Sequence, residues 1–226
     1  MCGSYVVICG RREPSKPVEA DGRSAVFVKA DIRDAAQAQK VIDQCMAETG
    51  RLDILVNNAG GSPPVEAATA SPVITDKIIQ LNLVAPLVLS QMAYSAMSAT
   101  KESANIINIA SVSGARPSPG TAAYGAAKAG LLSATKSLAQ EWGPGVRVNA
   151  IIVGLVHHDA GIEHYGGPEG FAKVAQMLPL KRMAEPTDIA DACLYLSSQQ
   201  AAYVSGASLE VDGGGEVPVF LHLADQ

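Results

Sequence analysis

The chain has 226 residues, of which 48% are hydrophobic and 17% charged, and its 17 basic and 22 acidic residues give a formal charge of −5. This length is enough to bury one substantial core, so we expect a soluble globular protein with a single domain over residues 1–226. The acidic balance, without a stripe of basic residues or basic residues interleaved with aromatic ones, argues against a nucleic-acid partner.

The cysteines and the apolar segments indicate the compartment. Cys2, Cys9, Cys45 and Cys193 are scattered without Cys-x-x-Cys spacing. This distribution is typical of reduced thiols in a cytoplasmic protein. The chain does not start with a charged segment followed by an apolar core, so we expect no signal peptide, and we also expect no membrane-spanning helix.

Strand-like and helix-like segments alternate along the chain. Short runs rich in Val and Ile predict buried strands at residues 4–10, 24–31, 52–60, 105–111, 146–153 and 207–214. Helical stretches are predicted between them, at residues 35–50, 73–100, 122–142 and 187–198. Gly50 is the expected C-terminal stop of the first helix and Thr187 the expected N-cap of the last. The alternation predicts an α/β fold, with a parallel sheet covered by helices on both faces.

A serine, a tyrosine and a lysine are the strongest catalytic candidates. Ser111 ends an apolar run, Tyr124 follows thirteen residues later, and Lys128 four residues after that. Residues four apart share one face of a helix, so the Lys128 ammonium is expected near the Tyr124 phenol. A phenol has an ordinary pKa of about 10, which an adjacent cation lowers. Tyr124 is thereby suited to exchange a proton with a substrate oxygen.

An ordinary helical pair is the simpler explanation of Tyr-x-x-x-Lys, because this spacing alone is common. The position of Ser111 favours a site instead. In open parallel sheets the ligand crevice lies outside the carboxyl ends of the strands, and Ser111 stands at such an end. We therefore expect an oxygen-binding corner between Ser111, the loop that follows it and the Tyr124 helix.

Six short motifs extend this interpretation. They are NNAG at 57–60, LNL with Asn82 at its centre, NIAS ending at Ser111, YGAAK at 124–128, VRVNAI at 146–151 and YVSGASLEVDGG at 203–214. In this order, over essentially the whole chain, they resemble the short-chain dehydrogenase/reductase family with a single Rossmann-like domain. The resemblance implies a doubly wound parallel sheet. It also implies an oxidoreductase that moves a hydride between a nicotinamide cofactor and a ketone or secondary alcohol.

The resemblance also assigns catalytic roles. Ser111 would hold the substrate oxygen, Tyr124 would move the proton, Lys128 would lower the Tyr124 pKa, and Asn82 would support a water relay behind Lys128. Tyr124 and Lys128 would also bind the cofactor, beside the nicotinamide ribose. For Asn82 a local hydrogen bond within its helix is the alternative. Family members commonly pair through the helices at 73–100 and 122–142, so we expect a homodimer or homotetramer.

Two arginines bear on the choice of cofactor. Arg11 and Arg12 follow the strand at 4–10, where the family places either an acid for the ribose hydroxyl or a base for a 2'-phosphate. A guanidinium matches phosphate with two hydrogen bonds, so NADP is expected in preference to NAD. The alternative is that both arginines are solvated in a surface loop.

Two segments match the family's contacts to adenosine. Asp31 and Ile32 resemble the pair that contacts adenine. Asn58, Ala59 and Gly60 resemble the stretch beside the adenosine ribose, although turn chemistry at a strand end would also explain the asparagine.

The segment after the strand at 146–153 departs from the family. A threonine normally grips the carboxamide and the pyrophosphate there, and this chain has His158 instead, while Val156 offers backbone groups. A metal site is a second interpretation, but the spacing matches no familiar site, and we favour a polar substrate loop. The residues concerned are His157, His158, Asp159, Glu163 and His164. The Gly-rich residues 163–170 are expected to belong to a lid over the substrate.

The start of the chain departs further. Family members open with a strand, a Gly-rich turn and a helix that receives the pyrophosphate, whereas the strand at 4–10 resembles the family's second. The family sheet runs 3-2-1-4-5-6-7, so the absent strand would leave a gap of roughly 10 Å at its middle. A shortened or mis-started chain, a partial sequence and a true variant are the possible explanations, and we favour an incomplete sequence. A true variant would be an inactive binding or assembly protein.

Overall fold

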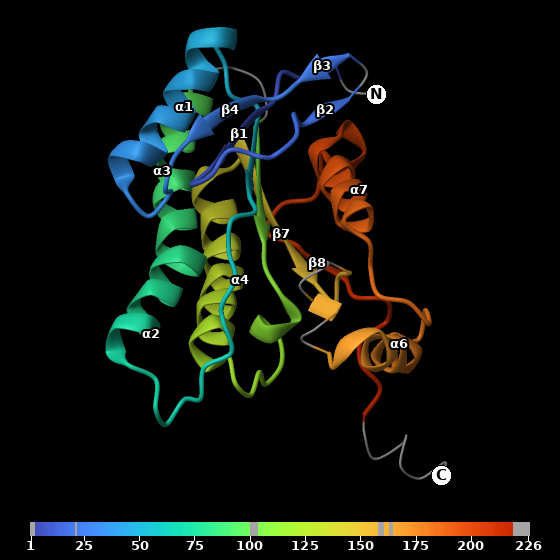
Figure 1. Ribbon diagram of the computed structural model, residues 1–226. Helices are drawn as coiled ribbons and strands as arrows, with labels where there is room; N and C mark the ends of the chain where they lie inside the picture. Colours follow the sequence, from blue (N-terminus) through green and yellow to red (C-terminus); the bar gives the residue numbers. More distant parts are fainter. Residues whose placement is uncertain (1–2, 21, 100–103, 158–160, 163–164, 219–226) are drawn as a thin grey trace.

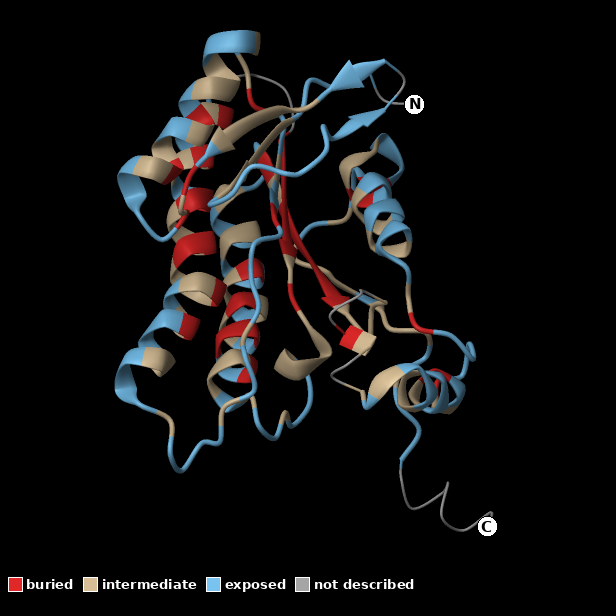
Figure 2. Cartoon of the chain, in the orientation of Figure 1, coloured by how far each residue is buried: buried red, intermediate tan, exposed pale blue. Residues whose placement is uncertain are grey.

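The computed structural model describes residues 3–20, 22–99, 104–157, 161–162 and 165–218 (Figure 1). Its centre is a four-stranded parallel sheet in the order β5-β6-β7-β8. These strands are β5 (Ile54–Asn57), β6 (Ala104–Ile109), β7 (Val146–Val153) and β8 (Ser208–Val211). β6 and β7 consist almost entirely of buried residues, because helices cover both of their faces (Figure 2).

Four further strands precede this sheet. β1 (Val7–Gly10) and β4 (Val26–Lys29) form a separate two-stranded parallel sheet. β2 (Glu19–Ala20) and β3 (Arg23–Ser24) form an exposed antiparallel pair. The sequence did not predict β2 and β3, because two-residue strands are too short to show an alternating pattern.

The helices cover the central sheet on both sides. α1 (Ala35–Thr49), α3 (Ala85–Met97) and α4 (Ala122–Trp142) lie on one face, and α7 (Pro186–Ser197) lies on the other (Figure 1). This arrangement confirms the expected Rossmann-like α/β fold. α2 (Pro72–Ile79) leads into α3 through the π-helical turn η1 (Gln80–Val84).

Two hydrophobic clusters lie on opposite faces of the sheet. Ile106 packs with residues of α1 and α3, whereas its neighbour Ile107 packs with Leu196 of α7. Successive strand residues point to opposite faces, so one apolar strand contributes to both clusters. This explains why β6 is a continuous apolar run rather than an alternating one.

The helix boundaries agree with the sequence in one case and differ in another. Gly50 ends α1 with φ of 68°, and its amide donates to the Met46 carbonyl, as predicted. The N-cap predicted at Thr187 is wrong. α7 is capped by Glu185, whose amide donates to the Asp188 carboxylate over 2.7 Å, and Pro186 occupies the first helical position. Proline suits this position because it has no amide hydrogen to leave unpaired.

Residues 163–170 contain the start of a helix rather than only a loop. α6 (Gly167–Met177) begins within the segment expected to be a lid. The glycines at its start weakened the helical pattern in the sequence. The buried face of α6 carries Ala175, which packs with Leu178 and Met183 in a third cluster.

One helical stretch, Pro72–Met97, is long and apolar enough to span a membrane by length and composition. Its residues Leu89, Ala93 and Met97 lie in the core that α3 shares with the sheet. Packing in the core therefore explains part of its apolar character, and the expectation that the chain has no membrane-spanning helix stays a prediction.

Buried amide side chains join the central strands to α3 and α4. The Asn57 amide donates to Ser90 Oγ over 2.9 Å and to Asn108 Oδ1 over 2.8 Å. The Asn108 amide in turn donates to Thr135 Oγ1 over 2.9 Å. These four side chains are at most 4% exposed. Because buried polar groups are costly to leave unpaired, this chain of hydrogen bonds fixes how β5 and β6 lie against the two helices.

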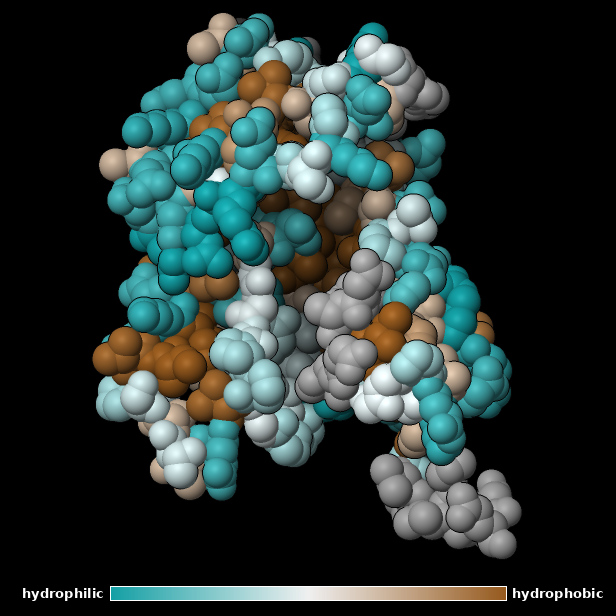
Figure 3. All heavy atoms as spheres, in the orientation of Figure 1, coloured by the Kyte–Doolittle hydropathy of each residue, from teal (hydrophilic) through white to brown (hydrophobic). Residues whose placement is uncertain are grey.

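The sheet is divided at the place where the sequence lacks the family's first strand. In the described residues neither β1 nor β4 pairs with β5, so β5 is an edge strand. Val56 is in register with the fully buried Ile107, yet both Val56 and Ile54 are 39% exposed. Figure 3 shows a hollow with hydrophobic residues in its depth between the N-terminal strands and α7. The expectation that β5 is a buried strand is therefore wrong for one of its faces.

Candidate active site

Ser111 stands directly beyond β6, as expected. Its backbone is extended, and it caps a short helical turn at Val112–Gly114, where its hydroxyl accepts a hydrogen bond from the Ser113 amide over 3.2 Å. The turn lies so close to α4 that a Cβ on Gly114 would approach the Lys128 carbonyl carbon within 2.7 Å. A residue without a side chain is therefore needed at position 114 for the Ser111 loop to reach the Tyr124 helix.

Tyr124 and Lys128 lie on the same face of α4, as the spacing predicts. The Lys128 Nζ is 5.7 Å from the centroid of the Tyr124 ring and donates to the carbonyl of Ile109 over 2.7 Å. The Lys128 residue is only 3% exposed. A cationic group thus lies at the carboxyl end of β6, beside a tyrosine and a serine.

The pKa values of the two groups have different causes. Burial lowers the pKa of Lys128 to about 8. Burial raises the pKa of Tyr124, and hydrogen bonding with the Ser111 side chain lowers it to a smaller extent. In this structure the Tyr124 pKa is therefore above its ordinary value, which differs from the expectation that Lys128 lowers it. The Lys128 ammonium donates to a backbone carbonyl, and desolvation of the phenol has the largest effect on the Tyr124 pKa.

Asn82 makes the local hydrogen bond within its helix that was the alternative to a water relay, and it also holds the loop after β5. It is fully buried in the π-helical turn, and its amide donates to the carbonyls of Gly61 and Ile78, each over 2.9 Å. Its Oδ1 accepts from the Gly61 amide over 2.8 Å. Asn82 thus clamps the loop after β5. π-Helical turns occur frequently at functional sites, and here the turn places the asparagine toward that loop.

Gly60 separates Asn82 from Lys128. A Cβ at this position would lie 2.8 Å from Asn82 Oδ1 and 3.2 Å from Lys128 Nζ. Both side chains are buried and hydrogen-bonded, so neither has room to move away. The glycine of the NNAG motif therefore leaves the space in which the lysine ammonium lies.

The expected adenosine contacts come from β1 and β4. Arg11 and Arg12 are exposed directly after β1, and the positive charge of Arg11 contributes to lowering the pKa of Asp31. The Asp31 carboxylate accepts from Arg33 Nε over 2.9 Å, and chiefly this hydrogen bonding lowers its pKa to about 2. Ile32 is 8% exposed and belongs to the core.

The other expected contacts are distributed over two strand ends. Asn58, Ala59 and Gly60 are exposed directly after β5, next to the Asn82 clamp. Val156 forms an isolated parallel bridge with Ala184, in which the carbonyl of Leu155 and the amide of His157 take part. The bridge leaves the backbone groups of Val156 pointing away from Ala184. His158 lies outside the described residues.

These residues fit the nicotinamide end of a dinucleotide cofactor better than the pyrophosphate at its middle. Lys128, Tyr124 and Ser111 converge at the carboxyl edge of the four-stranded sheet. In the described part of the chain, however, no helix directly follows β1 to receive a pyrophosphate, because β2, β3 and β4 come next and the first helix, α1, begins only at Ala35. β1 ends in one glycine, Gly10, which two arginines follow, so this strand end forms no Gly-rich turn.

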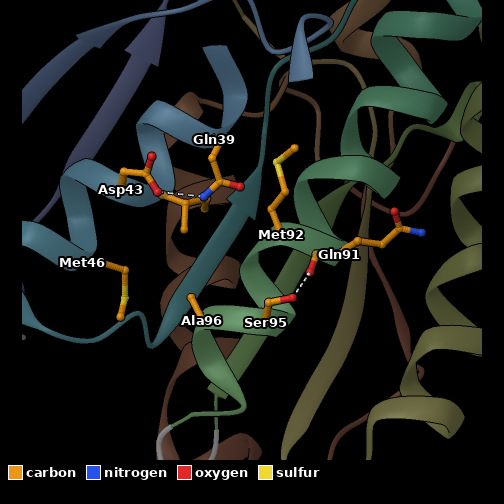
Figure 4. A pocket seen from close by; sticks show the side chains of 8 residues that line it. Gln39, Asp43, Met46, Gln91, Met92, Ser95 and Ala96 are labelled. Atoms are coloured by element: carbon orange, nitrogen blue, oxygen red, sulfur yellow. Dashed lines mark hydrogen bonds between the residues drawn. The ribbon is translucent and has the colours of Figure 1, made fainter. Parts of the chain in front are cut away.

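Two pockets are near the helices. One of about 360 Å³ adjoins the Ser111 loop, and its wall includes Ser113, Arg116, Tyr165 and Glu216. The sequence interpretation singled out none of the last three as a residue, although Arg116 lies in the loop after Ser111 and Tyr165 in the segment expected to be a lid; Glu216 lies outside every predicted site segment. A second pocket of about 490 Å³ lies between α1 and α3 (Figure 4). Its residues include none of the catalytic candidates and are Gln39, Ile42, Asp43, Met46, Gln91, Met92, Ser95 and Ala96.

Comparisons with known proteins agree with this geometry. Residues 2–216 match the family model described as enoyl-(acyl carrier protein) reductase. The chain therefore belongs to the short-chain dehydrogenase/reductase family of oxidoreductases.

Individual relatives support the same assignment. The chain is 34% identical over 226 residues to the granaticin polyketide synthase putative ketoacyl reductase 2 of Streptomyces violaceoruber, covering 95% of this chain and 87% of that protein. Ligand-free aldohexose dehydrogenase of Thermoplasma acidophilum superposes with a TM-score of 0.86 at 26% identity, covering 94% and 84% of the two chains. A 7α-hydroxysteroid dehydrogenase bound to NADH and 7-oxo glycochenodeoxycholic acid gives a TM-score of 0.80 at 31% identity, covering 86% and 76%.

The space at Gly60 can be tested by filling it. We expect Gly60→Ala to destabilise the fold by about 1–3 kcal/mol, because the added methyl group meets two buried polar side chains. Urea unfolding measures the change. Gly130→Ala is the control, since its Cβ would meet only the flexible end of Leu83, at 3.0 Å, and alanine favours a helix by about 1 kcal/mol. Equal midpoints for the two variants would show that the Gly60 space is not needed.

Proposed function

We propose that this protein is an oxidoreductase that interconverts a ketone and a secondary alcohol with NADP. The observation that supports this best is the convergence of Ser111, Tyr124 and the buried Lys128 at the carboxyl edge of the parallel sheet. Ligands of open α/β sheets bind at this edge. The reductase and dehydrogenase relatives support the reaction class.

The residues divide the proton chemistry between them. In the direction of ketone reduction, the Ser111 hydroxyl donates a hydrogen bond to the substrate oxygen, and Tyr124 delivers the proton to it. Tyr124, whose pKa burial raises above the ordinary value, carries its proton at neutral pH, as a donor must. The Lys128 ammonium stabilises the phenolate that results. A bound nicotinamide supplies the hydride.

NADP is proposed over NAD because of Arg11. Arg11 is exposed at the carboxyl end of β1 and lies close enough to Asp31 to affect its pKa. A guanidinium at this position suits a 2'-phosphate, with Arg12 beside it as a second donor. Asp31, Ile32 and the loop at 58–60 are proposed to contact the adenosine, and Val156 the nicotinamide end.

The remaining proposals concern organisation. We propose a single domain over residues 1–226, acting in the cytoplasm on a small carbonyl or alcohol substrate. A homodimer or homotetramer is proposed because α3 and α4 have apolar or small residues around much of their circumference. Cys9, Cys45 and Cys193 are free thiols, which suits a reducing compartment.

Removal of the proton donor tests the proposed chemistry. In a version extended by a strand, a Gly-rich turn and a helix at its start, we expect Tyr124→Phe to lower turnover of a reactive ketone about 10²- to 10⁴-fold at saturating NADPH, because a general acid is lost while the ring remains. Steady-state kinetics measure this change, and binding of NADPH should be largely retained. Tyr195→Phe, on the exposed surface of α7, is the control. Near-normal turnover by Tyr124→Phe would remove this residue from the mechanism.

Cofactor choice is tested at Arg11. In the same extended version, Arg11→Ala is expected to reduce the preference for NADP over NAD roughly 10- to 100-fold, which is the range for a charge-assisted phosphate contact. Fluorescence titrations with both cofactors give the ratio. Arg51→Ala is the control. Arg51 precedes β5, at the opposite end of this strand from the loop at 58–60, so its loss should leave the ratio unchanged. An unchanged ratio in Arg11→Ala would show that Arg11 is a solvated surface residue.

The divided sheet leads to a prediction about the 226-residue chain. We expect it to bind NADP weakly or not at all, since no Gly-rich turn receives the pyrophosphate. We also expect a low melting temperature compared with a version extended by a strand, turn and helix. A central strand buries apolar surface on both of its faces, at about 25 cal/mol per Å². Loss of this burial can exceed a domain's net stability of about 5–15 kcal/mol. Calorimetric titration and a thermal melt measure both, and micromolar binding with a cooperative melt would contradict the prediction.

A further inference from the structure

The pocket beside the Ser111 loop has walls of two kinds. Its volume is about 360 Å³, within the range of small-molecule sites. It is connected to the candidate active site through Ser113, whose amide donates to the Ser111 hydroxyl and whose carbonyl oxygen lies against Gly125, the neighbour of Tyr124. A ligand whose carbonyl lies at Ser111 and Tyr124 would therefore place the rest of its body here.

One wall is apolar. Val174, Met177 and Leu178, in and just after α6, face the pocket together with Leu155 from the segment after β7. Leu178 is 2% exposed and packs with Ala175 and Met183, so this wall belongs to a hydrophobic cluster rather than to a surface loop. Such a wall favours hydrocarbon over polar groups.

The other wall contains an ion pair. Arg116, from the loop after β6, donates to the Glu216 carboxylate, which lies a hundred residues further along the chain. Tyr165 lies near both groups: burial and Glu216 raise its pKa, and Arg116 lowers it. The hydroxyls of Ser113 and Ser118, 3.0 Å apart, are hydrogen-bonded to each other. The two serine hydroxyls and the charged groups of Arg116 and Glu216 in this wall thus have partners within the protein.

We propose that this pocket holds the body of an uncharged, largely apolar carbonyl substrate, and that the Arg116–Glu216 pair excludes substrates with a carboxylate. The inference rests on the proposed function and narrows its substrate class. Glu216 is the residue that determines this specificity. Its carboxylate occupies the guanidinium that would otherwise receive an acidic substrate, and it repels a second carboxylate.

The alternative arrangement would select the opposite substrate. An arginine next to an apolar wall is a carboxylate receptor when its guanidinium is unpaired, because it offers two parallel N–H donors. Here Glu216 pairs with the Arg116 guanidinium, so the two side chains together form a part of the wall without net charge. A single acidic residue on the segment after β8 therefore decides between acidic and neutral substrates.

Binding of two matched ketones tests the proposal without requiring turnover. The probes are 4-phenylcyclohexanone and 4-(4-oxocyclohexyl)benzoate, which differ by one remote carboxylate. We expect the wild-type chain to bind the neutral ketone more tightly, as measured by saturation-transfer NMR titration at pH 7. Glu216→Gln should tighten binding of the benzoate about 3- to 10-fold, a modest gain because the pair is partly exposed. Binding of the neutral ketone should change less than twofold.

Two further variants separate this effect from a general change of charge or fold. Glu169→Gln removes the same charge from the exposed surface of α6, where Glu169 pairs with Lys173, and should alter neither affinity. Arg116→Gln should weaken the benzoate further, because Glu216 then repels it without compensation. Equal wild-type affinity for both ketones, binding of neither, or no gain in Glu216→Gln would overturn the proposal. Selective binding of the neutral ketone, without NADPH-dependent turnover in the version extended by a strand, turn and helix, would instead count against the proposed function alone.

Discussion

Burial of one ammonium group determines the arrangement of the candidate active site. Lys128 is 3% exposed, and its Nζ is held by the Ile109 carbonyl at the end of β6. A buried charge is costly unless hydrogen bonds compensate for it, which is why its pKa falls to about 8. Two neighbours leave space for this group. Gly60 has no side chain that would approach the Lys128 ammonium, and Asn82 holds the Gly60–Gly61 loop in place beside it.

The strand ends are fixed by the buried amides as much as by the ladder of the sheet. The chain of hydrogen bonds from Ser90 through Asn57 and Asn108 to Thr135 crosses from α3 over two strands to α4. These hydrogen bonds thereby fix the position of the Tyr124 helix relative to β5. Apolar packing alone would tolerate a shift between helix and sheet, whereas a chain of directional bonds loses its partners when shifted.

The sequence predicted most of the fold and the positions of the catalytic candidates within it, and the reasons for its failures are local. Residues with strong periodicity or a motif were placed correctly, such as Gly50, Ser111 and Lys128. The N-cap at Glu185 was missed because the capping partner, Asp188, follows within the helix, and proline at 186 was not weighed. The direction of the Tyr124 pKa was missed because desolvation depends on the packed surroundings, not on the spacing to Lys128. Glu216 and Arg116 meet only through the fold, a hundred residues apart.

The divided sheet separates the two halves of the proposed cofactor site. Arg11 and Asp31 follow the strands of the β1–β4 sheet. Ser111 follows β6 of the sheet that starts at β5, and Tyr124 and Lys128 lie on α4, which packs on that sheet. In the described residues, α1 is the main element that joins them, since it packs on β1 and β4 and also on α3. A dinucleotide that bridges both halves needs their separation to be constant. The exposed apolar residues Ile54 and Val56 border the division, so a strand paired there would bury them and link the two sheets through backbone hydrogen bonds. Cofactor affinity and the stability of the fold therefore depend on the same edge of β5.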